Sequence, residues 1–389
     1  ECALAFATRM MEIGILLVLG LLSFVFPVFR LPSPTGPVPV GTTVLPPDDP
    51  LGLTLQIWYP TQDSAGYPRA WYAPVGGGRR NKIFRWIRTA ARLDAPPSRS
   101  GSFPVLVYVN SYGGTRWENT ALLQELASHG FVVAAGDQPS GVLDGVDLAA
   151  PMDFSTEDSY AETMRRIPVK LRAQVRAASQ VLDRLTKLNA QPGSRFFGRF
   201  DMTHAGIIGF SFGGATAAEA AVTDRRFRAS LNMDGLTFGE AARFGPPHPY
   251  LEMSDGSSLP TDAERQSSDP AVSILARVLD ENERHTRANF ARNGGYYLTI
   301  SGSQHPNFSD YPILVPWRRM NGAGPIDPAR AGEIVRYWAV GFFRATLQGG
   351  KMPGSTVDPE VKLESWPPPD RNPASSNQAA PANPVAEPR

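Results

Sequence analysis

A serine flanked by glycines is the first candidate for chemistry in this chain of 389 residues. The segment GFSFGG at 209–214 contains the pattern G-x-S-x-G, with Ser211 at its centre. An apolar run leads into the pattern and a run of small residues follows it, so the serine stands between a predicted strand and a predicted helix. This setting is typical of a nucleophile elbow, a strained turn that exposes a serine hydroxyl. An ordinary glycine-rich turn is the alternative interpretation.

A nucleophilic serine needs a general base, and histidine is the usual one. Behind an elbow of this kind the base lies on the loop after the last strand, later in the chain than the serine. His305 meets this requirement, because it follows the apolar run 296–301. The other four histidines have different interpretations. We interpret His129 as a helix cap and place His204 at the wrong end of the elbow strand. His248 lies in a proline-flanked loop, and His285 lies on a solvated helix face.

Two aspartates between the serine and the histidine could orient the imidazole and stabilise its protonated form. Asp234 ends the apolar run 229–233, and Asp255 follows the run 250–253. Topology mildly favours Asp255, because it follows the penultimate strand. Both remain candidates on the residues alone.

The oxyanion of an attacked carbonyl needs two backbone N–H donors. One belongs to Phe212, directly after the serine, and we expect the second at Tyr112, in the loop NSYGG at 110–114. A plain Gly-Gly turn is the alternative interpretation of this loop. With these donors, Ser211 deprotonated by His305 would attack an ester carbonyl, and water would hydrolyse the acyl-enzyme. We expect no metal and no cofactor.

Seven apolar runs and five helical stretches must position these residues. The apolar runs predict strands at 53–59, 103–110, 131–136, 205–210, 229–233, 250–253 and 296–301. The helical stretches lie at 117–129, 160–188, 214–222, 262–292 and 327–347. Alternation of buried strands with helices predicts an α/β fold, with a mostly parallel central sheet covered by helices on both faces.

Composition excludes several other classes of protein. The 38 Lys and Arg residues balance 37 Asp and Glu residues, so a net charge of +1 gives no argument for nucleic-acid binding. The single cysteine, Cys2, excludes intrachain disulfides and a cysteine nucleophile in the core. Hydrophobic residues make up 42% of the chain, enough for a sizeable core.

The ends of the chain differ from its centre in composition. Within residues 1–30, the run 13–29 is apolar and uncharged, which predicts an uncleaved membrane anchor; a cleaved signal peptide, and hence export, is the alternative. Residues 31–50 are proline-rich and predict a linker. Residues 366–389 predict a disordered tail. The catalytic domain is then expected at 51–365.

Two further segments stand apart from the strand–helix alternation. Residues 79–92 carry six basic and no acidic side chains at a spacing that predicts an amphipathic helix, either on a membrane surface or packed on the domain as an insertion. Residues 138–168 are acidic and predict a lid over the acyl site, or else a long surface loop.

Three segments taken together resemble the plasma-type platelet-activating factor acetylhydrolases, a branch of the α/β-hydrolases. They are GFSFGG, LNMDG at 231–235 and SGSQHPNFSD at 301–310, and the resemblance covers most of residues 40–350. It implies that Asp234 is the acid, with Asp255 as the alternative. There are two departures from the family pattern: Asn110-Ser111 replaces the usual His-Gly, and Phe210 replaces the elbow histidine.

The resemblance also implies a substrate class. It indicates a serine ester hydrolase that removes short or oxidised sn-2 acyl groups from phospholipids. A general carboxylesterase or polyester hydrolase is the alternative, because the same three residues serve all of them. A non-catalytic binding protein on this fold is a third interpretation, and the intact set of serine, histidine and aspartate argues against it.

Overall fold

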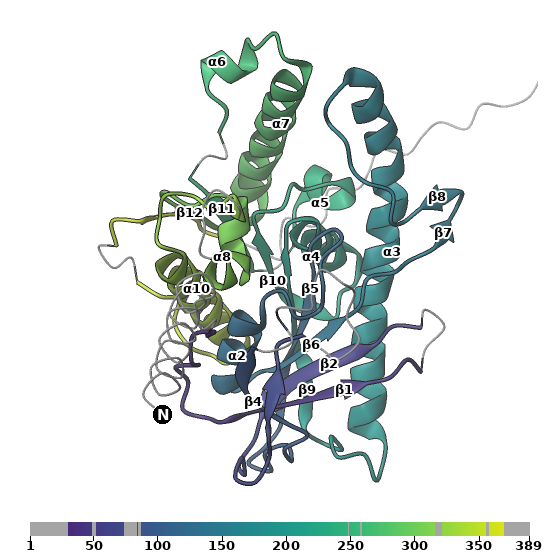
Figure 1. The fold of residues 1–389 in the computed structure, drawn as a ribbon, viewed down its shortest axis with the longest axis vertical. Coiled ribbons are helices and arrows are strands. Elements are labelled where there is room, and N and C mark those ends of the chain that lie inside the picture. Colours follow the sequence, from purple (N-terminus) through teal and green to yellow (C-terminus); the bar gives the residue numbers. More distant parts are fainter. Residues whose placement is uncertain are drawn as a thin grey trace, which may run out of the picture.

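The computed structural model describes residues 30–48, 52–73, 84, 87–247, 249–256, 259–315, 321–354 and 358–368. A mixed sheet of eleven strands runs through this part of the chain (Figure 1). Its strands, in their order across the sheet, are β13 (Val361–Trp366), β12 (Gly295–Ile300), β11 (Tyr250–Asp255), β10 (Phe227–Met233), β9 (Phe200–Phe210), β5 (Phe103–Val109), β6 (Val132–Gly136), β2 (Leu55–Pro60), β1 (Val40–Leu45), β4 (Arg88–Leu93) and β3 (Arg69–Trp71).

The centre of the sheet is parallel. The six strands from β12 to β6 pair in parallel, whereas β13, β2 and β3 pair antiparallel with their neighbours. A separate short hairpin consists of β7 (Val142–Leu143) and β8 (Val146–Asp147). The predicted α/β fold with a mostly parallel sheet is therefore confirmed.

Helices cover both faces of the sheet (Figure 1). They are α2 (Thr120–Ser128), α3 (Glu157–Ala190), α4 (Phe212–Thr223), α5 (Gly239–Phe244), α6 (Asp262–Arg265), α7 (Pro270–Asn293), α8 (Tyr311–Leu314) and α10 (Pro328–Leu347), with the 3-10 helix η3 (His305–Phe308). The helices α2 and α10 pack on one face, and α3 and α4 pack on the other.

Side-chain alternation along β5 shows how one strand serves both layers. Leu106 and Tyr108 belong to the core shared with α2 and α10. Val105, Val107 and Val109 belong to the core shared with α3 and α4. Successive side chains of a strand point to opposite faces, so a continuous apolar run is what a doubly covered strand requires.

The sheet extends beyond the domain boundaries expected from composition. Val40–Leu45 forms β1, inside the segment 31–50, and β13 ends at Trp366, inside the predicted tail. The prediction of a linker is therefore wrong for Val40–Leu45. Thr42 and Thr43 are buried there, and β1 pairs with both β2 and β4. β-branched threonines suit such a position, but the surrounding prolines obscure the pattern.

The basic segment does not form the predicted helix where the structure describes it. Arg88–Leu93 is the strand β4, paired with β1 and β3, and its burial alternates, with Thr89 and Ala91 inside. Strand pairing overrides the helical spacing of apolar residues, because β4 supplies backbone partners to the sheet edge. Residues 79–83, 85 and 86 lie outside the described part of the chain.

The predicted helix 262–292 is two helices. α6 ends at Arg265, and α7 begins at Pro270 behind the cap residue Asp269, whose carboxylate accepts a hydrogen bond from the Ala271 N–H at 2.9 Å. Proline favours the first position of a helix and prevents continuation from the preceding turn. Similarly, α3 begins at Glu157, so the excursion predicted as 138–168 ends at Thr156.

Among the described residues, no helix is both long enough and apolar enough to cross a membrane. The run 13–29 lies outside them, so the anchor and the export alternative stay predictions.

Candidate active site

The serine of the G-x-S-x-G segment occupies a strained turn between β9 and α4. Ser211 has φ 58° and ψ −126°, in the region of positive φ that side chains rarely adopt. A Cβ on Gly209 would lie 2.0 Å from the Gly213 carbonyl oxygen, and one on Gly213 would lie 2.1 Å from that of Val109. Both glycines are therefore required for the close approach of helix and strand. The Ser211 N–H donates to Met233 O at 2.9 Å, which fixes the turn to β10.

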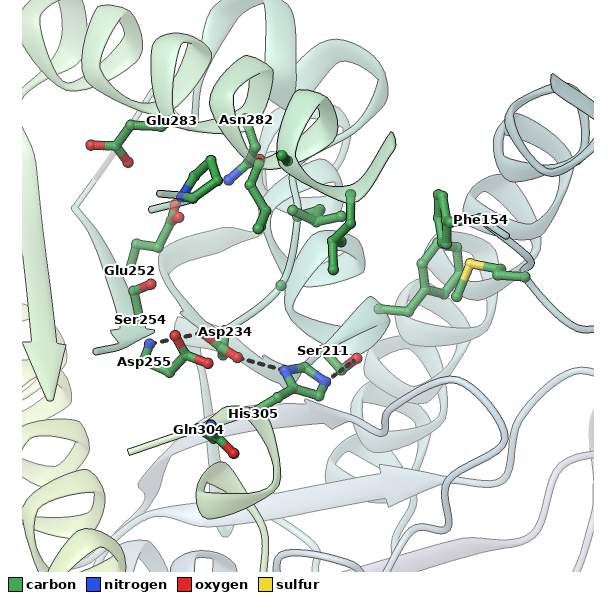
Figure 2. Close-up of a pocket in the computed structure, with 18 of the residues that line it drawn as sticks. Phe154, Ser211, Asp234, Glu252, Ser254, Asp255, Asn282, Glu283, Gln304 and His305 are labelled. Carbon is green, nitrogen blue, oxygen red and sulfur yellow. Dashed lines mark hydrogen bonds and ion pairs between the residues drawn. The ribbon is translucent and has the colours of Figure 1, made fainter. Parts of the chain in front are cut away.

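Ser211, His305 and Asp234 form one hydrogen-bonded series (Figure 2). His305 Nε2 lies 2.9 Å from Ser211 Oγ, and His305 Nδ1 lies 2.5 Å from Asp234 Oδ2. The three residues follow β9, β12 and β10 at the same edge of the sheet, where the carboxyl ends of parallel strands meet. In this geometry His305 can take the hydroxyl proton while the aspartate holds its other nitrogen.

Asp234 is held by its backbone as well as by its side chain. It has φ 56°, and its N–H donates to Met253 O at 2.8 Å. Its second oxygen, Oδ1, accepts from the Asp255 N–H at 2.9 Å. Asn232 braces the turn, because its amide bonds both the N–H and the carbonyl of Gly235, at 2.9 and 2.7 Å. Asp255 thus contacts the series through its backbone N–H.

The loop that carries His305 is fixed by its own polar residues. Gly302 has φ 73°, a conformation that glycine adopts without strain. Asn307 Oδ1 accepts from the N–H groups of Gln304 and Gly324, at 3.0 and 2.8 Å. The ring of Phe210 lies 4.9 Å from the imidazole ring and packs against it. The imidazole is therefore held by the loop beneath it and by an aromatic neighbour.

The pKa of His305 is raised above its ordinary value. Burial lowers the pKa of the imidazole, but the hydrogen bond and charge of Asp234 outweigh that effect, and Asp255 and Glu118 add to the rise. Carboxylates near an imidazole favour its protonated form. The raised pKa makes the imidazole a stronger base toward the serine hydroxyl.

The two expected oxyanion donors are the backbone N–H groups of Phe212 and Tyr112. Phe212 is the first residue of α4, where backbone N–H groups lack helical acceptors. Within the part of the chain that the structure describes, neither the Phe212 N–H nor the Tyr112 N–H donates to another residue. The two rings meet edge to face at 6.1 Å. Both N–H groups therefore remain available to an oxygen of the substrate.

The half-buried carboxylate of Glu118 shapes the loop that contains Tyr112. Glu118 accepts from the Ser111 N–H at 2.6 Å, the Ser111 hydroxyl at 2.9 Å and the Tyr108 hydroxyl at 2.9 Å. Burial raises its pKa, and these hydrogen bonds counteract the rise. Ser111, one of the departures from the family pattern, thus anchors its loop to Glu118.

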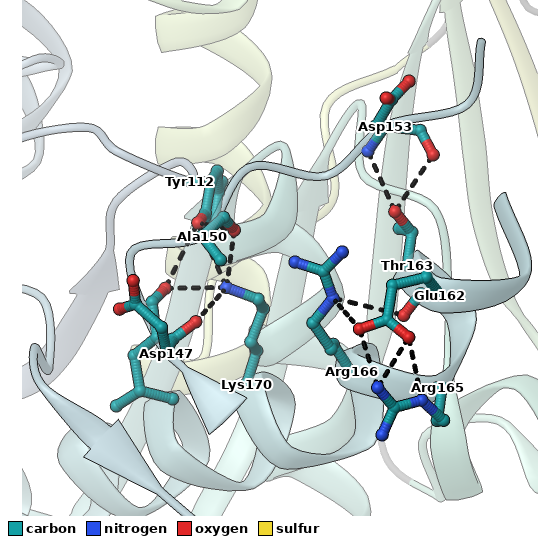
Figure 3. A network of polar contacts seen from close by, with 10 residues as sticks. Tyr112, Asp147, Ala150, Asp153, Glu162, Thr163, Arg165, Arg166 and Lys170 are labelled. Carbon is teal, nitrogen blue, oxygen red and sulfur yellow. Dashed lines mark hydrogen bonds and ion pairs between the residues drawn. The ribbon is translucent and has the colours of Figure 1, made fainter. Parts of the chain in front are cut away.

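A lysine joins the same loop to the acidic excursion (Figure 3). Lys170 of α3 is 3% exposed and donates to the carbonyl oxygens of Asp147, Leu148 and Ala150 at 3.1, 2.8 and 2.8 Å. It also donates to the Tyr112 hydroxyl at 3.1 Å, and that hydroxyl donates to Ala150 O. The ammonium group therefore ties α3, the excursion and Tyr112 together.

Two cavities meet at Ser211 and His305. The larger has a volume of 760 Å³ and lies between α7 and the sheet edge, and Met152 and Phe154 of the excursion line it (Figure 2). The smaller, of 390 Å³, is lined by Tyr112 and by further aromatic side chains. An ester bound at the serine therefore has space on both sides of the scissile bond. The excursion contributes to the wall of the larger cavity, as the lid interpretation expects.

Sequence reasoning missed the residues that support the site. Lys170 and Asn232 are buried in a helix and a strand, and Glu118 is half-buried just before α2; polar residues are rare at buried positions unless they are paired. A lysine on the core-facing stripe of α3 was a detectable signal.

Of the remaining histidines, His129 is the C-cap of α2, as predicted, and His204 pairs with Asp201 at 2.7 Å on the surface. His285 lies within α7, and His248 lies outside the described residues.

A family model matches part of the chain. Residues 179–242, which contain the elbow and Asp234, match the model of platelet-activating factor acetylhydrolase, isoform II.

Curated relatives match over most of the chain. Platelet-activating factor acetylhydrolase of Cavia porcellus is 24% identical over 368 residues, covering 82% of this chain and 78% of the relative. The enzyme of the same name from Bos taurus is 24% identical, covering 72% and 68%. A probable 1-alkyl-2-acetylglycerophosphocholine esterase of Arthroderma benhamiae is 22% identical, covering 72% and 69%.

Among solved structures, a ferulic acid esterase from Streptomyces cinnamoneus is similar, with a TM-score of 0.65 and 26% identity. The match covers 86% of this chain and 98% of that esterase. The relatives and this structure are all ester hydrolases by name.

Proposed function

We propose a substrate and catalytic residues for this carboxylic ester hydrolase, which belongs to the platelet-activating factor acetylhydrolase family of α/β-hydrolases. It removes short or oxidised sn-2 acyl groups from phospholipids, through Ser211, His305 and Asp234. The hydrogen-bonded series from Ser211 Oγ through the imidazole to the Asp234 carboxylate carries this proposal. The curated relatives support the substrate class.

The reaction follows from this series in two halves. His305 Nε2 takes the proton of Ser211 as the hydroxyl oxygen attacks the ester carbonyl, and it then protonates the departing alkoxide. Water next enters, gives a proton to the same nitrogen and hydrolyses the acyl-enzyme, which restores the serine. Asp234 keeps the Nδ1 proton in place and stabilises the imidazolium in both halves.

The N–H groups of Tyr112 and Phe212 stabilise the oxyanion in each tetrahedral intermediate. Neither N–H is engaged by another described residue, so no internal hydrogen bond must break before the substrate binds. Glu118 and Lys170 hold the Tyr112 loop from either side. The donors are thereby oriented before the negative charge develops.

A hydrolysis panel tests the substrate class. We expect phosphatidylcholine with an sn-2 acetyl group to be hydrolysed with a kcat/KM at least about 100-fold above that of the long-chain lipid, a difference of about 2.7 kcal/mol in transition-state stabilisation. Release of the free fatty acid from both lipids and from p-nitrophenyl esters would be measured, with Ser211→Ala as the blank. Equal rates on the two lipids would contradict the proposal and favour a general carboxylesterase.

The pH dependence of hydrolysis tests the role of His305. Catalysis requires the neutral imidazole, so activity should appear as the pH rises through the pKa of His305. Because that pKa is raised, we expect the acid limb of kcat/KM to lie above about 6.5, the value for a free imidazole. Initial rates on p-nitrophenyl acetate in buffers of constant ionic strength would locate the limb. A limb at or below that value would contradict this assignment.

A broader ester hydrolase is the second candidate function. The larger cavity exceeds what an acetyl group needs, and a ferulic acid esterase resembles the chain over 86% of its length. Both observations favour activity on esters with bulky acyl groups. The panel separates the candidates, because a general carboxylesterase would hydrolyse p-nitrophenyl esters without preference for the short sn-2 acyl group.

A further inference from the structure

The larger cavity beside Ser211 has two kinds of wall. Met152, Phe154, Phe212 and Phe238 make one wall apolar. On the opposite side, Glu252 of β11 and Asn282 of α7 line the cavity, and we call this pair the polar wall (Figure 2). A cavity that only held hydrocarbon would not need hydrogen-bonding groups at this place.

Glu252 is buried without a full set of partners. The side chain is 4% exposed, and one carboxyl oxygen accepts from the Tyr250 hydroxyl at 2.8 Å. The other oxygen receives no hydrogen bond from a described residue, and Glu252 is one of the residues that line the cavity. Burial raises the pKa of Glu252 to about 8, with a contribution from Glu283, so the carboxyl is mostly protonated at pH 7 and can donate as well as accept.

Asn282 presents a donor to the same space. Its Oδ1 accepts from the Thr237 N–H at 2.7 Å and from the Thr237 hydroxyl at 2.9 Å. These two donors fix which end of the amide is oxygen, so the NH₂ group is on the cavity side, toward Glu252 in Figure 2. Within the described chain, that NH₂ group has no acceptor.

The charge of the cavity narrows the class of ligand. Its lining includes five carboxyl groups and, among described residues, no lysine or arginine; the five are Asp234, Glu252, Asp255, Glu264 and Glu283. A carboxylate on the ligand would be repelled, and a methyl group would leave the polar wall unpaired. A hydroxyl group can accept from Asn282 and donate to Glu252 at once.

We propose that the polar wall binds an uncharged hydroxyl group on the part of the ester that occupies the larger cavity. The inference rests on the proposed function in that the ester is cleaved at Ser211. It goes further in naming a feature of the substrate and the two residues that select it. The hydroxyl belongs either to the acyl chain or to the alcohol, and the test separates these two sources.

Two matched series of esters test the inference. In the acyl series, p-nitrophenyl esters of four to eight carbons end in a methyl, hydroxyl, carboxylate or trimethylammonium group. In the alcohol series, acetates of alcohols of the same lengths carry the same end groups. The measured quantity is the ratio of kcat/KM for each polar end group to that for methyl, because this ratio cancels changes common to all substrates.

We expect kcat/KM for the hydroxyl-terminated ester to exceed that for the methyl-terminated ester by about tenfold or more, at one chain length of one series. Glu252→Met should bring the ratio to about one, since it removes the hydrogen-bonding group. Glu252→Gln, which keeps a neutral hydrogen-bonding group, should preserve it. The control Glu281→Gln alters the neighbouring exposed residue of α7, away from the cavity lining, and should also preserve it.

Three results would overturn the inference. They are no hydroxyl preference at any length in either series, a greater preference for carboxylate or trimethylammonium, and a ratio that Glu252→Met leaves unchanged. Methyl-terminated esters report hydrolysis itself, without any phospholipid. A failed phospholipid assay therefore counts against the proposed substrate, whereas normal hydrolysis of methyl esters without the hydroxyl preference counts against the polar wall alone.

Discussion

Replacing Ser211 by alanine is expected to lower kcat by about 10⁶-fold, the loss typical of removing the nucleophile from a serine hydrolase. The hydroxyl oxygen, 2.9 Å from His305 Nε2, is the atom we propose to form the acyl-enzyme. Without it, no covalent intermediate forms, and the oxyanion donors and binding groups alone provide the residual rate. Steady-state hydrolysis of p-nitrophenyl acetate gives kcat, and mass spectrometry after a fluorophosphonate probe reports on the nucleophile.

A neighbouring serine provides the control for this variant. Ser301 is exposed at the end of β12, and its backbone N–H, which donates to Glu360 O, is unaffected by loss of the hydroxyl. Ser301→Ala should therefore keep its activity and its labelling by the probe. Full turnover by Ser211→Ala, or labelling of a residue other than Ser211, would refute the proposed mechanism and reopen the interpretation of the chain as a binding protein.

Asp234→Asn is expected to lower kcat by about 10⁴-fold, while Asp255→Asn changes it by less than about tenfold. The asparagine would offer an N–H to His305 Nδ1 in place of an acceptor, which favours the wrong tautomer of the imidazole. Asp255 contributes a backbone N–H to Asp234, and exchange of its side chain leaves that N–H in place. Values of kcat and KM for the two variants, with circular dichroism to confirm folding, decide between the two acids.

The same pair of variants also shifts the pH profile differently. Loss of the Asp234 charge removes the main contribution that raises the pKa of His305, whereas loss of the Asp255 charge removes a smaller one. The acid limb of any residual activity in Asp234→Asn should therefore move to lower pH. A large loss of kcat in Asp255→Asn with little loss in Asp234→Asn would make Asp255 the acid.

The residues of the site could be predicted because parallel strands end at one edge. Ser211, Asp234 and His305 each follow an apolar run, and such runs are the clearest signal of buried strands. Topology mildly favoured Asp255, whereas the carboxylate that contacts His305 in the structure belongs to Asp234; β10 and β11 are adjacent and parallel, so both acids follow strands that end at the same edge. The positive φ of Asp234 turns its side chain toward the histidine, and no single-residue pattern predicts that conformation.

The edge of the sheet was harder to predict than its centre. β4 contains Arg88 and Arg92 and is paired at the edge, so its side chains do not form a continuous apolar run. Ile87, just before β4, and Ala91 within it are both buried. Their spacing of four residues places them on one face of a helix and equally on one face of a strand. Pairing between distant segments decides such cases, and propensity alone does not contain that information.

Lys170 has a consequence for any exchange of parts between this chain and its relatives. Its ammonium group donates to three carbonyl groups of the excursion and to the phenol of Tyr112, so one side chain holds both the excursion and the loop expected to bind the oxyanion. A transplanted excursion would bring its own turn, and the lysine and tyrosine would have to be transplanted with it. We therefore expect replacement of the excursion to change substrate range and catalytic rate together.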